Sequence, residues 1–405
     1  MGGCSPTCAA KVSTLRMIWE SARNFLCRPC YGLSGRWRGG DMRGNGAAVT
    51  VVRQSHAWTQ AELARMARVS QGYISKIENG QLDLEGEQLA HLAEVLEVPS
   101  ELLAIREPGL GTGVSCVHHR RRRSRLTATA SKRIEGLTHL ISLTVTRLIE
   151  ELPGGPELKL PELPVGDYRP AEAARQVRAM GGLADEPIDD IIRFVEWLGV
   201  VVLRRDLGTD AQDGVSLNLP GRRPVIVVNT ALPGDRQRLS VAHELGHLVL
   251  HGWQVATGED SVEQEAFEFA GELIAPRAAI RDNLAGLTRR DFRRLLDLKI
   301  TWGMSMAALI QQGLRLGVID EQLHRTLRIS LNQLGWAKVE PGTVAEETPH
   351  LMTKVVDTHL DTLSRTRDKV ASTALMLPGP FTRHYLSHRA DNKSGHQEGS
   401  NGDLG

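Results

Sequence analysis

The spacing of apolar residues predicts a mainly helical chain that contains one short run of strands. Over residues 53–105, and again over 131–150, apolar side chains recur every three or four positions, as on one face of an amphipathic helix. Three short apolar runs are typical of strands, and they lie at Gly199–Leu203, Gly214–Asn218 and Pro224–Asn229. Further helices are predicted around these strands, at 171–180, 188–198, 288–298, 304–316 and 319–334. The patterns indicate a multidomain, mainly α fold class, with a small sheet that makes the later domain α+β.

Residues 59–80 predict two short helices joined by a tight turn. Thr59 is a suitable N-cap for the first helix. Arg68–Ser70 forms the turn, and the second helix, Gln71–Glu78, ends at Asn79 and Gly80. This pattern resembles the helix-turn-helix of the Xre, phage-repressor-like family. The residues that carry the likeness are Thr59-Gln60, Leu63-Ala64, Val69-Ser70, Ile74-Ser75, Ile77-Glu78 and Gly80.

The resemblance implies that the second helix enters the major groove of DNA. Gln71 has the donor and acceptor groups that pair with adenine, whereas Gln60, Lys76 and Asn79 are expected to meet phosphates. The full set expected on or near the contact surface is Gln60, Gln71, Gly72, Tyr73, Ser75, Lys76 and Asn79.

The charge of this segment leaves a second use of the same fold open. Residues 51–105 hold four Lys and Arg against eight Asp and Glu, whereas a DNA-contacting face is usually basic. Docking to a protein is therefore the alternative to DNA binding. The run His118–Arg125 is either a solvated stretch of a linker or a further phosphate contact.

The sequence His243-Glu244-Leu245-Gly246-His247 lies in an apolar frame that favours a helix. Residues four apart share one helical face, so His243 and His247 can bind one zinc ion. Glu244, next to the first histidine, can act on a water molecule there as a general base. The motif predicts a zinc hydrolase, and most simply a peptidase.

A catalytic zinc site needs a third protein ligand. One solution is a His six residues after the second, but Trp253 occupies that position. His251 lies two turns from His243, about 12 Å along the helix axis, so these side chains cannot share a tetrahedral ion with a third one between them. Downstream, an apolar helical stripe continues through Glu263, and a carboxylate on a buried face needs a partner or a metal. Glu263 is the predicted third ligand, and Glu265 is the alternative.

Both motifs together, His243–His251 and Glu263–Pro276, resemble the ImmA/IrrE family of zincin-like metallopeptidases. Phe267 stands where the family usually has Asn, and Ala275 where it has Met, but neither change removes a ligand. The family cleaves repressor proteins. The roles that the resemblance implies are zinc binding by His243, His247 and Glu263 and general base catalysis by Glu244.

Composition places few further limits on the protein. The formal net charge is +1, so no overall attraction to nucleic acid or to a membrane follows. No apolar run has the length of a transmembrane helix, and the N-terminus lacks an apolar signal core, so we expect a cytoplasmic protein. Residues 1–41 contain Cys4, Cys8, Cys27 and Cys30, whose spacing leaves a small structural zinc module as the alternative to disorder.

These patterns predict six segments along the chain. They are a disordered or over-extended start (1–41), a helix-turn-helix domain (45–106), a linker with a basic run and one helix (107–165), a zincin-like metallopeptidase domain with a helical tail (166–335), a C-terminal helical extension (336–387) and a disordered tail (388–405).

The combination predicts a bacterial stress-response or transcription regulator. The first hypothesis is a zinc endopeptidase that cuts a repressor-type protein and is coupled to DNA through the helix-turn-helix. The alternative is a DNA-binding regulator whose metal-binding domain senses or docks without peptidase turnover. The expected partners are DNA, a protein substrate and, because phage-repressor-like domains often pair on palindromes, a second copy of the chain in a homodimer.

Overall fold

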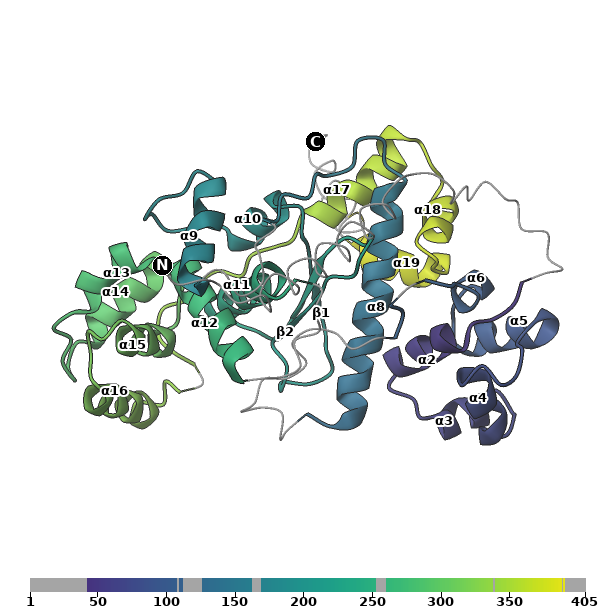
Figure 1. Cartoon of the computed structure of the whole chain (residues 1–405), viewed down its shortest axis with the longest axis horizontal. Coiled ribbons are helices and arrows are strands. Elements are labelled where there is room, and N and C mark those ends of the chain that lie inside the picture. The colour runs from purple at the N-terminus through teal and green to yellow at the C-terminus, as the bar shows by residue number, and fades with distance from the viewer. Residues whose placement is uncertain are drawn as a thin grey trace, which may run out of the picture. The chain divides into compact units, whose positions relative to one another are not determined.

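The computed structural model describes residues 42–107, 109–111, 126–161, 169–252, 260–337, 339–387 and 389 (Figure 1). Contacts divide the chain into two units, Met1–Met42 and Arg43–Gly405, and every element below belongs to the second. The predictions for the N-terminal cysteines, for the run His118–Arg125, for Trp253 and for nearly all of the tail 388–405 lie outside the described residues. Among the helices that are described, none combines the length and the apolar composition needed to cross a bilayer.

Five short helices form the N-terminal part of this unit. They are α2 (Gly46–Ser55), α3 (Gln60–Met66), α4 (Gln71–Glu78), α5 (Gly86–Val95) and α6 (Ser100–Leu103). Thr59 caps α3 in a capping box with Glu62, and the Ser70 hydroxyl caps α4 by accepting from the Tyr73 N–H. The two helices predicted around the turn at 68–70 are therefore confirmed. Helix α2, which the sequence pattern did not predict, adds four buried apolar side chains to their core, Ala48, Val49, Val51 and Val52.

The sheet lies near the middle of the chain and has three strands. They are β1 (Val201–Arg205), β2 (Gly214–Leu217) and β3 (Val225–Asn229), and all three were predicted. Their order is β1-β3-β2, with β1 parallel and β2 antiparallel to β3. β2 therefore lies at one edge of the sheet, and its second edge carries no further strand among the described residues.

The two faces of the sheet contact two different apolar cores, because side chains alternate along a strand. Val202, Ile226 and Val228 belong to the first core, which the helices on one side complete. These helices are α9 (Pro170–Met180), α10 (Ile191–Trp197), α11 (Gly234–Leu250) and α12 (Asp260–Ile274). Val201, Leu203 and Val227 belong to the second core, which includes α8 (Ala128–Glu150).

Two further groups of helices extend these cores. The first core continues into α13 (Arg277–Leu284), α14 (Phe292–Trp302), α15 (Met306–Arg315) and α16 (Glu321–Gln333). The second core continues into α17 (Leu351–Asp357), the π-helical turn η1 (Thr358–Thr362), α18 (Arg367–Thr373) and α19 (Pro378–Tyr385). The second group contacts the sheet through α17 and β1, whereas α13–α16 extend the first core mainly through contacts with one another.

Helix α14 begins later than the sequence pattern predicts. The expected range was 288–298, whereas the helix spans Phe292–Trp302. Thr288 explains the difference, because its N–H and its hydroxyl both donate to the Asp291 carboxylate, at 2.7 Å each. The side chain thus holds a turn that competes with the first helical turn.

Helix α8 lies between the N-terminal helices and the sheet. Gly136 marks its crossing with α2, where an added Cβ would lie 2.6 Å from the Val51 carbonyl oxygen and 2.8 Å from the Ser55 nitrogen. Only a residue without a Cβ allows the two backbones to approach this closely. The opposite side of α8 packs in the second core. Within the segment 107–165, which the sequence analysis assigned to a linker, this helix is thus buried on two sides.

We expect Gly136→Val to force α8 away from α2, because the new side chain has no space between the two backbones. Overpacking of this kind costs about 1–3 kcal/mol, which urea unfolding of the full chain would measure. Ala128→Val, at an exposed position of the same helix, is the control and carries only the helix-propensity cost. Equal stabilities of the two variants would contradict the close crossing.

Candidate functional site

Helix α11 holds the H-E-x-x-H residues in the interior of the unit. The helix packs on β2, β3 and α12, and nearly all of its residues are buried. His243, Glu244 and His247 are at most 3% exposed. The two histidines are one helical turn apart, and their Nε2 atoms lie 3.1 Å from each other. Both imidazoles therefore direct a nitrogen toward the same point.

Glu263, on α12, directs its carboxylate to that point as well. Its Oε2 lies 3.4 Å from Nε2 of His243, and its Oε1 lies 3.5 Å from Nε2 of His247. Ligand atoms about 2.0–2.2 Å from a tetrahedral zinc ion lie roughly 3.3–3.6 Å apart. The two distances from nitrogen to carboxylate lie in this range and the distance between the nitrogens is slightly shorter, so these three largely buried donors fit a zinc site.

The other two candidate ligands pair with each other. His251, at the C-terminal end of α11, places its Nε2 3.0 Å from Oε2 of Glu265. Its Nδ1 lies 3.2 Å from Nδ1 of His247. A metal-binding histidine commonly donates its second ring N–H to a neighbour that fixes its orientation. His251 and Glu265 thus support the ring of His247 instead of joining the cluster.

Glu244 is held from the sheet side. The Ser216 hydroxyl, on the edge strand β2, donates to Oε2 of Glu244 at 2.7 Å. At Gly214, on the same strand, an added Cβ would lie 3.3 Å from Cγ of Glu244. The strand therefore fixes this carboxylate both by a hydrogen bond and by close packing.

A cleft of about 770 Å³ passes His243 and Glu244. One side is formed by residues 211–214, which lead into β2, and by Arg236 and Ser240 of α11. The other side is formed by α15 and α16. Phe267 contributes a ring whose centroid is 4.2 Å from that of His243. The buried cluster is thus open to a ligand that enters along this cleft.

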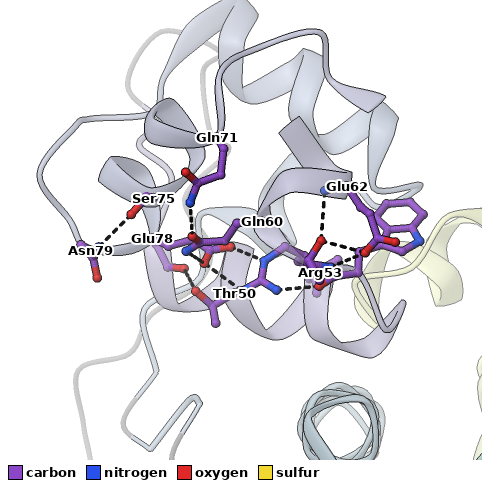
Figure 2. A network of polar contacts seen from close by, with 12 residues as sticks. Thr50, Arg53, Gln60, Glu62, Gln71, Ser75, Glu78 and Asn79 are labelled. Carbon is purple, nitrogen blue, oxygen red and sulfur yellow. Dashed lines mark hydrogen bonds and ion pairs between the residues drawn. The ribbon is translucent and has the colours of Figure 1, made fainter. Parts of the chain in front are cut away.

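A second set of polar contacts joins α2, α3 and α4 (Figure 2). The side-chain amide of Gln71 donates to Oε1 of Gln60 at 2.9 Å, and the side-chain amide of Gln60 donates to Oε2 of Glu78 at 2.8 Å. Arg53 donates to both oxygens of Glu78, at 2.6 and 2.8 Å. The side chains of Arg53 and Glu78 are only 9% and 5% exposed, so this pair is a buried bidentate ion pair. The network fixes how α4 sits on the two helices before it.

The remaining predicted DNA-contact residues lie along α4 and its end. The Tyr73 hydroxyl donates to Oε1 of the Gln88 side chain at 2.8 Å, and the Asn79 amide donates to the Ser75 hydroxyl at 3.4 Å. None of the predicted contact residues is fully buried. Gln71, Gly72, Lys76 and Asn79 are exposed, and Gln60, Tyr73 and Ser75 are half-buried. The surface of α4 is thus available for a ligand, although Gln60 is engaged with its neighbours.

The sequence analysis named the three residues that the structure brings together around one point, His243, His247 and Glu263, and also Glu244, which lines the cleft with His243. It did not identify Ser216. The available signal was weak, since a single serine in the strand Gly214–Leu217 is also compatible with an ordinary core position. The residues of α16 that line the cleft were missed as well, because helical periodicity does not indicate which surface faces a cleft.

Comparisons with known families match two segments of the chain. Residues 52–103 match the model of the helix-turn-helix family. Residues 195–312 match the model of the IrrE N-terminal-like domain, which belongs to peptidase family M78. A search of curated proteins finds no match to the chain. The protein therefore carries a helix-turn-helix domain followed by a domain of the IrrE N-terminal-like peptidase family.

Proposed function

We propose that this protein is a zinc-dependent endopeptidase that acts on a regulatory protein, such as a repressor, and is coupled to DNA through its helix-turn-helix domain. The observation that carries the proposal is the convergence of His243, His247 and Glu263, together with the position of His243 and Glu244 in the lining of an open cleft. Three metal-type donors at this spacing, with a carboxylate that can act as a base next to one of them, are the arrangement expected of a metal-dependent hydrolase.

His243, His247 and Glu263 would hold the metal, and Glu244 would act on the substrate. When bound, zinc supplies a Lewis acid that polarises a peptide carbonyl and makes a water molecule more acidic. Glu244 would take a proton from the attacking water and pass it to the leaving amine. The hydrogen bond that the Ser216 hydroxyl donates to Oε2 would hold the Glu244 carboxylate in position for this transfer.

The edge position of β2 suits an extended peptide. Its outer side carries no strand among the described residues, so backbone N–H and C=O groups there can pair with a substrate segment. The same strand holds Glu244 through Ser216. A peptide bound along this edge would therefore pass the proposed base and the metal ligands.

The helix-turn-helix domain indicates a DNA-binding regulator with a metallopeptidase-like domain. In our proposal α4 makes the contact with DNA, and the protein is a cytoplasmic regulator of bacterial type. It would bind palindromic sites as a homodimer. The alternative is a transcription regulator in which the metal-binding domain senses or docks without turnover. The match to the helix-turn-helix family supports DNA binding in both cases, and the buried pair of Arg53 and Glu78 holds α4 in place.

Glu244→Gln separates the two functions. The substitution keeps the shape of the side chain but removes the base, so cleavage should fall by about 10²–10⁴-fold while zinc content is unchanged. The measurement is cleavage, by the zinc-loaded full chain, of repressor-type proteins encoded beside its gene.

The matched control for this experiment is Glu268→Gln, at an exposed position of α12. It should cleave at the parent rate. Parent-like cleavage by Glu244→Gln would contradict the proposed base, and regulation that persists in Glu244→Gln would favour the sensing alternative.

A footprint on promoter DNA tests the role of α4. Gln71→Ala combined with Lys76→Ala should abolish it, because both side chains are exposed on the surface proposed to face the groove. Gln333→Ala with Arg293→Ala makes the same chemical change at exposed positions of α16 and α14 and should leave the footprint intact. If the parent protein gives no footprint, the DNA-binding part of the proposal is wrong.

A further inference from the structure

The two sides of the cleft differ in charge. On the side of β2, Asp213 and Arg236 form a bidentate ion pair, with Oδ1 and Oδ2 each 2.7 Å from a guanidinium nitrogen. Each side chain neutralises the other, so this ion pair offers a substrate little net charge. A charged group on the opposite side would therefore dominate the electrostatic selection of a substrate.

Helix α16 supplies such charges. Arg325 and Arg328 both line the cleft, both are exposed, and their separation of three residues places them on one helical face. Among the described residues neither forms an ion pair. Glu321 is the acidic residue that this helix adds to the lining, so two arginines stand against one glutamate.

His324, which precedes Arg325, does not alter this balance of charge near neutral pH. Burial lowers its pKa, and the positive charge of Arg328 lowers it further. Its Nε2 lies 3.1 Å from Oε1 of Gln311, also in the cleft lining, so the neutral ring donates there. The positive charge of this side comes from the two guanidinium groups.

We propose that Arg325 and Arg328 make the cleft selective for a substrate segment that carries an acidic side chain. This inference rests on the proposed function and names the class of its substrate. The planar fork of a guanidinium group matches a carboxylate with two parallel hydrogen bonds. A peptide is the favoured ligand over a nucleic acid, because the same cleft is lined by the proposed base Glu244 and by Gly214 of the edge strand β2.

Selection of peptides from a random display library tests the inference without requiring turnover. The bait is the full-length Glu244→Gln protein loaded with zinc. We expect peptides enriched in Asp or Glu. Adding Arg325→Glu and Arg328→Glu to the bait should weaken binding of a selected acidic peptide by about tenfold and shift the selection toward Lys and Arg.

Two further variants keep the result interpretable. Arg289→Glu with Arg290→Glu makes the same charge change at exposed positions outside the cleft lining and should leave the selection unchanged. Arg325→Gln with Arg328→Gln should lose the acidic preference without reversing it. A folding defect cannot account for the reversal in the Glu variant, because a misfolded cleft would lose selectivity and would not select Lys and Arg.

The possible outcomes separate this inference from the peptidase proposal. The role of α16 is overturned if the selected peptides are not enriched in Asp or Glu. It is also overturned if the Arg289→Glu and Arg290→Glu control loses as much binding of the acidic peptide as the variant with Arg325→Glu and Arg328→Glu. Competition by short DNA duplexes, but not by acidic peptides, overturns it in favour of a nucleic-acid ligand. If acidic peptides bind but the parent protein does not cut them, the charge selectivity stands and the peptidase proposal fails.

Discussion

Packing of α11 against α12 is the contact on which the candidate metal site depends. His243 and His247 belong to one helix and Glu263 to the other, so the three donors meet only if the helices approach closely. Gly246, between the two histidines, allows this approach. A Cβ there would lie 3.2 Å from the Ala266 carbonyl oxygen and 3.1 Å from the Phe269 ring. The apolar stripe of α12 then fixes the rotation of the helix, because Ala266, Phe269 and Ala270 are fully buried against it.

The sheet adds the second constraint. Its strand order places β2 at an edge, and Ser216 on that strand donates a hydrogen bond to Glu244. This short strand thus orients the proposed base and, at Gly214, lines the cleft. The cleft between this edge and α16 then explains why the arginines of a distant helix can influence which segment reaches Glu244.

Much of this arrangement was predictable from the sequence, for reasons that differ between the two domains. Thr59 is a strong local signal for the start of α3, and the turn at residues 68–70 separates α3 from α4, so both helices could be predicted locally. Glu263 was predictable because a carboxylate interrupts an apolar helical face. Other features could not be predicted locally. Helix α2 lacks a comparable signal, and the burial of α8 depends on contacts with residues far away in the sequence. Likewise, nothing local to Ser216 indicates that it meets Glu244, and the start of α14 depended on a side-chain turn at Thr288.

The metal content of purified full-length variants tests the central claim most directly. Zinc would be measured by elemental analysis of the parent protein, of Glu263→Gln and of Glu268→Gln, an exposed control on the same helix. If His243, His247 and Glu263 form the site, the parent and Glu268→Gln retain zinc, and Glu263→Gln loses about one ion per chain relative to both. Equal zinc in all three proteins, or no zinc in the parent, would contradict the site.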